Sequence, residues 1–221
     1  MKFQAGDQTD TDLVRGIQHE FLWCDDAFST FQATAGSVIV NGQTPERSYA
    51  AYNAYSQFVF HLYEFMMGCF ARDIGDTAVT NAKGPRGQPA SAMCDYYITR
   101  HANRILKQTR EAIENGTAPA WENALSAYPV EVPDGFAATF RRVRNKAIGH
   151  VSSIRATLDL TAFYTAHHLM LVLLWRDARA WWGLNGKPMP DLDQVTAFMS
   201  AVVARESVPK DLCKPAPKST Q

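Results

Sequence analysis

Residues 141–150 carry the side chains of this chain whose types and spacing best suit a chemical reaction. The segment reads Arg-Arg-Val-Arg-Asn-Lys-Ala-Ile-Gly-His. Arginine keeps its proton and can bind two phosphate oxygens at once, whereas the imidazole of histidine takes up and releases a proton near neutral pH. Together, Arg144 and His150 can therefore bind a phosphate group and transfer a proton.

The surroundings of this segment are basic. Residues 135–158 contain no Asp or Glu but five basic side chains: Arg141, Arg142, Arg144, Lys146 and Arg155. The chain as a whole is neutral, with 22 basic and 22 acidic residues, which argues against wrapping by nucleic acid over the entire surface. Any polyanion site is therefore expected to be local, at this segment.

The order of these residues resembles the signature of the HEPN family (higher eukaryotes and prokaryotes nucleotide-binding). In that signature an arginine, usually followed by a polar residue, precedes a histidine with four to six residues between them, and here Arg-Asn-Lys-Ala-Ile-Gly-His fits it over about ten residues. Asn and Lys after the arginine, with a small residue before the histidine, are similar to HEPN proteins of abortive-infection and toxin–antitoxin systems.

This resemblance implies a helical bundle that dimerises along the helix of the motif. Two Arg/His sets then share one cleft and cleave RNA without a metal ion, in a toxin or phage-defence effector whose partner is an antitoxin or another regulatory protein. In the HEPN subgroup that a nucleotidyltransferase adenylylates, a tyrosine lies two residues after the histidine. Ser152 occupies that position here, so the resemblance does not extend to that regulation.

The spacing of the two motif residues has a geometric meaning on a helix. Six positions on an α-helix correspond to about 9 Å along the axis and about 120° around it, so Arg144 and His150 can flank one phosphate. RNA cleavage needs two proton transfers, one from the 2′-hydroxyl and one to the leaving 5′ oxygen. One histidine per chain supplies only one of them. The symmetry mate or water supplies the other, and activity is expected to depend on the dimer.

Supporting roles are expected for the neighbours. Asn145 is placed to orient the substrate or the imidazole, and Lys146, Arg141 and Arg142 to attract RNA phosphates. Glu64 lies in an apolar run and is expected to pair with Arg144 or Lys146 across the bundle, most simply as a structural salt bridge, because a buried carboxylate needs a partner.

Two other functions are compatible with the same residues. The chain can be a non-catalytic HEPN-like module that binds a nucleotide or a protein, or an unrelated bundle with a solvated basic face. In these cases His150 packs at the edge of an apolar stripe, and Arg141, Arg142 and Lys146 face water.

Several other site types are absent from the sequence. It has no Glu-x-x-His pair, no His-Glu-x-x-His, no Walker loop and no Gly-x-Gly-x-x-Gly. The adjacent His167 and His168 would point about 100° apart on a helix, which suits one metal ion poorly. We therefore expect no metal or other cofactor. His61, His101 and His167 fall on or near apolar stripes and are expected in the core.

The elements that carry these residues are predicted to be helices. Apolar residues recur at helical spacing over residues 10–32, 45–72, 90–115, 135–155 and 159–182, and a shorter helix is expected over 191–205. The fold class is therefore all-α, a bundle of four to five main helices. We predict one domain over residues 1–205, followed by a disordered tail over 206–221.

Cysteine usage and hydropathy predict a cytoplasmic protein. Cys24, Cys69, Cys94 and Cys213 are scattered without a Cys-x-x-Cys pair, and acidic residues interrupt the N-terminal segment, which argues against a signal peptide. The apolar run over residues 58–70 is too short to span a bilayer, so no membrane partner is expected.

Overall fold

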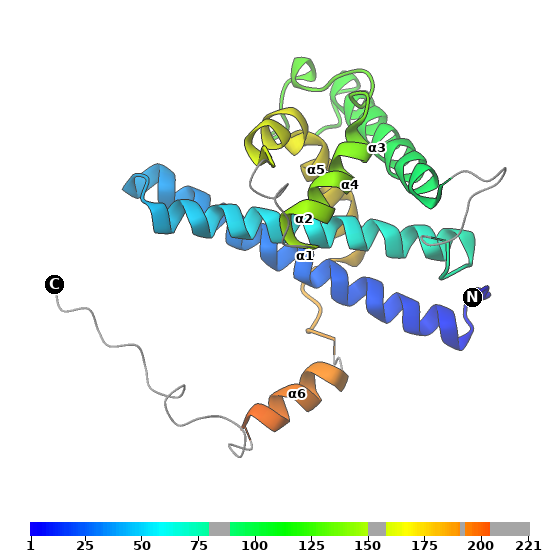
Figure 1. Cartoon of the computed structure of the whole chain (residues 1–221). Coiled ribbons are helices and arrows are strands. Elements are labelled where there is room, and N and C mark those ends of the chain that lie inside the picture. Colours follow the sequence, from blue (N-terminus) through cyan, green and yellow to red (C-terminus); the bar gives the residue numbers. More distant parts are fainter. Residues whose placement is uncertain (80–88, 150–157, 191–192, 204–221) are drawn as a thin grey trace. The chain divides into compact units, whose positions relative to one another are not determined.

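The computed structural model describes residues 1–79, 89–149, 158–190 and 193–203 (Figure 1). The main helices are α1 (Gln8–Asn41), α2 (Pro45–Ile74), α3 (Ala90–Glu114), α4 (Phe136–Arg144) and α5 (Leu160–Trp182). A 3-10 turn lies at Leu125–Ala127, and a π-helical segment at Asn145–Gly149 follows α4 directly. The described residues form no strand, which confirms the prediction of an all-α helical bundle.

The chain separates into two compact units. The first, Met1–Gly183, contains α1 to α5. The second, Leu184–Gln221, is described over residues 184–190 and 193–203 and contains α6 (Asp193–Val203), which exposes Val195, Phe198 and Met199 to solvent. Residues 206–221, for which we predict a disordered tail, lie outside the described residues.

Helices α1 and α2 form a long hairpin. Asp7 caps α1 by accepting a hydrogen bond from the backbone N–H of Asp10, and Thr44 caps α2, where Pro45 occupies the first turn. The predicted end of the first helix at residue 32 is wrong, because α1 continues to Asn41 alongside α2. The helix ends at the Asn41-Gly42 pair, where the side chain of Arg47 on α2 donates hydrogen bonds to the carbonyl oxygens of Asn41 and Gly42, and Gly42 has a φ of 78°.

The two helices of the hairpin lie close together at Gly68. A Cβ atom at this position would lie 2.7 Å from Cγ1 of Ile17, which is closer than van der Waals contact allows. The absence of a side chain at Gly68 therefore makes room for Ile17 between α1 and α2.

Helix α2 is the central helix of the first unit. It packs against α1, α3, α4 and α5. Its buried side chains lie on more than one face, since Phe58 and Phe65 are buried and so are Tyr63 and Met67. The helix predicted over residues 45–72 is confirmed. Different residues of α2 consequently meet side chains from different helices.

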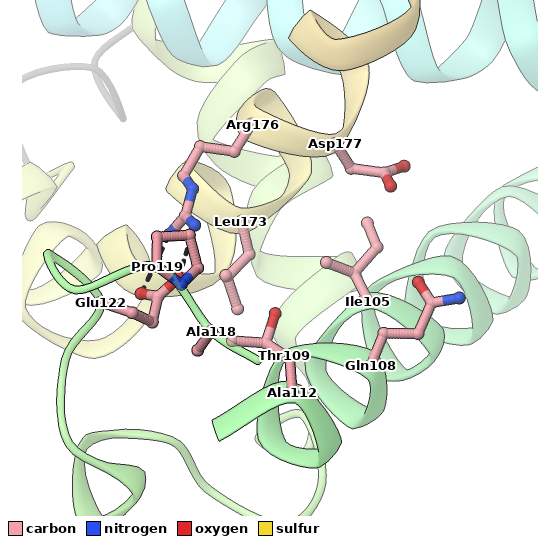
Figure 2. A pocket seen from close by; sticks show the side chains of 10 residues that line it. All are labelled: Ile105, Gln108, Thr109, Ala112, Ala118, Pro119, Glu122, Leu173, Arg176 and Asp177. Carbon is pink, nitrogen blue, oxygen red and sulfur yellow. Dashed lines mark hydrogen bonds and ion pairs between the residues drawn. The ribbon is translucent and has the colours of Figure 1, made fainter. Parts of the chain in front are cut away.

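The connector between α3 and α4 is held against α5 by an ion pair. The side chain of Glu122 is only 5% exposed and accepts hydrogen bonds from both Nη groups of Arg176 and from the hydroxyl of Tyr128. The hydrogen bond from Arg176 holds the pKa of Glu122 below its usual range. Figure 2 shows this pair beside a hollow of about 290 Å³ that Ile105 of α3 and Leu173 of α5 also line. The ion pair thereby fixes the position of the connector that leads into α4.

In the part of the chain that the structure describes, no helix is long and apolar enough to cross a membrane. The cysteines Cys24, Cys69 and Cys94 are free thiols. Burial raises the pKa of the Cys69 thiol to about 12, so this group stays protonated at neutral pH.

Candidate functional site

Arg144 is the last residue of α4, and its guanidinium lies against α2. Its Nε and Nη2 groups both contact Oε1 of Glu64, and Nη1 donates a hydrogen bond of 2.7 Å to Oδ1 of Asn145. The guanidinium carbon also lies 5.2 Å from the centre of the Phe60 ring and 5.6 Å from that of Tyr63. These contacts fix an arginine side chain that remains 30% exposed.

We predict that Glu64 pairs with Arg144 or Lys146, and its partner in the structure is Arg144. Its side chain is 29% exposed, so the pair lies at the surface of the bundle and not in the core. An ion pair with this exposure contributes little to stability, on the order of 1 kcal/mol or less. Its main effect is to hold the arginine in one position.

Asn145 begins the π-helical segment directly after Arg144. Its backbone N–H is shared among the carbonyl groups of the last turn of α4. Its side chain accepts a hydrogen bond from Arg144, so it orients the arginine, a role that the sequence did not predict. Single π-helical turns inside helices occur often at functional sites.

The π-helical segment also corrects the predicted geometry of the motif. We predict one α-helix over residues 135–155, but the α-helical part ends at Arg144 and the five residues Asn145–Gly149 follow the wider π-helical turn. The angle of about 120° between Arg144 and His150 holds only for an α-helix. His150 itself lies outside the described residues.

Arg141 forms a second ion pair. Its Nε and Nη2 groups each donate a hydrogen bond of 2.9 Å to the carboxylate of Asp95 on α3. The hydrogen bond to Asp95 raises the pKa of Arg141 above its already high ordinary value. This pair joins α4 to α3. Its two side chains are 31% and 22% exposed, which is close to the exposure of Arg144 and Glu64.

Arg142 and Lys146 are in a different situation. Arg142 is exposed, and Lys146 is half-buried. Within residues 1–79, 89–149, 158–190 and 193–203, neither side chain has a carboxylate within ion-pair distance.

A second polar pair joins α1 to α2 and was missed by the sequence prediction. We predict His61 to be a core histidine, but its side chain is 16% exposed, and its Nδ1 lies 2.7 Å from Oε1 of Glu20 on α1. The two residues are 41 positions apart and neither belongs to a motif, so no signal in the sequence indicates the pair. The prediction is correct for His167, which is buried.

Two hollows lie along the α1 and α2 hairpin. His61 lines the first, a groove of about 620 Å³, together with the exposed aromatic residues Trp23 and Tyr49. Glu20 and Glu64 line the second, of about 290 Å³. The partner of Arg144 and the partner of His61 therefore face the same hollow.

Metal ligands do not gather in this region. Among the residues that the structure describes, no three His, Cys, Asp or Glu side chains converge as ligands around one point.

The chain matches no known protein family, no characterised protein and no solved structure.

Proposed function

We propose that this chain is a metal-independent endoribonuclease of HEPN type that acts as a homodimer in the cytoplasm, as a toxin or phage-defence effector. The observation that carries the proposal is the state of Arg144. Its guanidinium is anchored by Glu64 and Asn145 at the start of a π-helical turn, yet it stays partly exposed.

An anchored arginine suits the transition state of RNA cleavage. When the 2′ oxygen attacks phosphorus, negative charge builds up on the phosphoryl oxygens, and a guanidinium can donate two parallel hydrogen bonds to them. Glu64 and Asn145 occupy three of the five N–H groups of Arg144. Because these contacts are formed before substrate binds, little reorganisation is needed during the reaction.

His150 is proposed to transfer a proton in the same reaction. Arginine cannot release its proton at neutral pH, so a second kind of side chain must do this, and His150 follows Arg144 within the motif. In the dimer, the shared cleft receives two such pairs, one from each subunit. Water or the second His150 completes the other proton transfer.

Arg142 and Lys146 are proposed to attract the RNA. They carry positive charge on the same short stretch as Arg144 and have no carboxylate partner in the described part of the chain. Charges of this kind raise the rate and strength of RNA binding in a salt-dependent way and do not select a sequence.

The test is RNA cleavage in the presence of EDTA. The purified protein is incubated with a mixed-sequence single-stranded RNA, alongside Arg144→Ala and His150→Ala. Arg100→Ala is the matched control, because Arg100 is exposed on another helix, α3. We expect cleavage by the wild type and by Arg100→Ala, and a loss of at least about 100-fold in the other two variants.

Two results contradict the proposal. One is the absence of cleavage by the wild type with or without divalent cations, and the other is full activity of either Arg144→Ala or His150→Ala. The expected dimer is measured separately by sedimentation at the concentration of the cleavage assay. A strict monomer that still cleaves RNA contradicts the composite site but not the activity.

A further inference from the structure

The outer part of the α1 and α2 hairpin, residues 29–53, has no core of its own. None of these residues is buried, although the two helices run side by side to their tip (Figure 1). Large apolar side chains are exposed instead, among them Ile39, Val40 and Tyr49. Most of the stability of a helix in a protein comes from packing, so this part of the hairpin is expected to have a partner.

The same part of the chain is almost free of charged side chains. Residues 27–60 contain two, Glu46 and Arg47. The chain average of 20% would give roughly seven over this length. The solvent-facing side of a helix normally carries charges, whereas the centre of a protein interface is depleted of them and enriched in tyrosine. The composition of the hairpin is therefore that of an interface.

One face of the hairpin carries both a hollow and an exposed aromatic side chain. The hollow is the groove of about 620 Å³ between α1 and α2, whose lining includes the small residues Ala27, Ala50 and Ala54. Tyr49, which is 72% exposed, lies at the outer end of the groove and Trp23 at the inner end. Such a face is complementary to a copy of itself, because in a two-fold contact the tyrosine of each chain can occupy the hollow of the other.

The size and charge of this face also fit a contact between two copies. From Trp23 to Asn41 the face is about 27 Å long, and two helices side by side are about 20 Å wide. The projected area of roughly 550 Å² is of the order of the about 800 Å² of accessible surface that each partner contributes to a standard interface. Like charges would face each other across a two-fold axis, and the near absence of charge on the hairpin removes this repulsion.

We infer that the outer hairpin is a contact surface for a second copy of this chain. The two hairpins pack antiparallel into a four-helix arrangement, with Tyr49 of each copy in the groove of the other. The partner helices then cover uncharged side chains that residues 29–53 expose to water. This contact does not involve α4 or Arg144, so it is separate from the shared cleft of the proposed function and does not rest on that function.

The first test is Tyr49→Glu, measured by sedimentation equilibrium of the full chain. The variant places a carboxylate in the partner's groove, which Asp26 also lines. We expect the mass of the assembly to fall by half, whether or not the motif helix makes a contact of its own. Thr34→Arg, inside the groove, should have the same effect. Tyr96→Glu is the matched control, since Tyr96 is 68% exposed on α3, and it should keep the mass of the wild type.

Cross-linking tests whether the hairpin contacts itself. In the antiparallel arrangement the two-fold axis crosses the middle of the groove, so the Asn53 side chains of the two copies come close together. Asn53→Cys should therefore form a linked pair with a short bismaleimide. The wild type, with its own cysteines, and Tyr96→Cys should not. Circular dichroism at high dilution checks that each variant keeps the helix content of the wild type.

Three results overturn the inference. One is a monomeric wild type, and another is a mass that stays unchanged in Tyr49→Glu and Thr34→Arg. The third is a halved mass without the cross-link in Asn53→Cys, which would mean that a different surface of the second copy lies on the hairpin. RNA cleavage plays no part in these measurements, so a wild type that does not cleave RNA overturns only the proposed function.

Discussion

Arg144 and Glu64 are 80 positions apart in the chain and form an ion pair in which two nitrogens of the guanidinium contact one carboxylate oxygen. The pair joins the end of α4 to the middle of the central helix α2. It is also half-exposed, so it fixes the arginine at the surface without adding much stability.

Replacing Glu64 should distinguish the positioning of Arg144 from the binding of RNA. In Glu64→Gln the anchor of Arg144 is weakened, so we expect cleavage to slow by about 10-fold to 100-fold. RNA affinity should stay the same or increase, because a negative charge next to the phosphate site is removed. Single-turnover rates and fluorescence anisotropy measure the two quantities.

The control for this variant is Asp95→Asn, which weakens the Arg141 pair of nearly the same exposure. Both variants should lose about 1 kcal/mol or less of unfolding free energy. Only Glu64→Gln should slow cleavage. Equal rates for Glu64→Gln and the wild type would show that Arg144 needs no anchor.

The salt dependence of RNA binding tests the role of Arg142. Each cation that neutralises a phosphate of single-stranded RNA contributes about 0.7 to the slope of log K against log salt. We expect Arg142→Ala to reduce the slope by about this amount, whereas Arg100→Ala leaves it unchanged. An unchanged slope in Arg142→Ala would place this arginine outside the RNA interface.

Buried histidines make the fold sensitive to acid. Burial lowers the pKa of His168 to about 4, and Tyr55 lies 3.2 Å from its Nδ1. An unfolded chain protonates this histidine near pH 6.5. Between about pH 6.5 and pH 4 the unfolded state therefore binds more protons, so the unfolding free energy falls as the pH falls. Below pH 4 both states are protonated and this contribution stops changing.

The loss expected from His168 is on the order of 2 kcal/mol, after allowance for its partial exposure. Urea unfolding at several pH values measures it. His168→Gln should flatten the dependence between pH 6.5 and pH 4. Part of the slope should remain, because burial also lowers the pKa of His167. An unchanged slope in His168→Gln would mean that the site is open to water.

Two glycines of the hairpin should respond to alanine in opposite directions. Gly68→Ala places a Cβ 2.7 Å from a carbon of Ile17, so α1 and α2 must move apart, and we expect a loss of about 1 to 3 kcal/mol. Gly36 lies inside α1 with no atom near its Cβ position, so Gly36→Ala should stabilise the protein by about 0.5 to 1 kcal/mol. Thermal or urea unfolding distinguishes the two, and a stabilising Gly68→Ala would contradict the close approach.

Much of the fold could be predicted from the sequence because it depends on local patterns. Apolar periodicity predicted the helices, and Asp159 caps α5 by accepting a hydrogen bond from the backbone N–H of Ala162. The extension of α1 to Asn41 was not predicted, because its residues include Gly36 and the non-periodic apolar run 38–40, and none of them is buried. The π-helical turn after Arg144 was missed for a similar reason, because its residues carry no local signal that distinguishes them from an α-helix.

The candidate site was predictable only in part. Arg144 stands out through its motif, and Glu64 through its position in an apolar run, where a carboxylate needs a partner. The pairs Arg141 with Asp95 and Glu20 with His61 depend on which helix faces which, and a single sequence does not contain this information.

The central claim is that Arg144 supports attack by the RNA 2′-hydroxyl without a metal ion, and the most direct measurement is the chemistry of the cut ends. RNA is cleaved in EDTA, and the products are compared with those of an RNA that carries a 2′-deoxynucleotide at the cut site. The account predicts 2′,3′-cyclic phosphate and 5′-hydroxyl ends, no cleavage at the deoxy position and no cleavage by Arg144→Ala. Ends that carry a 5′-phosphate, or cleavage that requires a divalent cation, would contradict it.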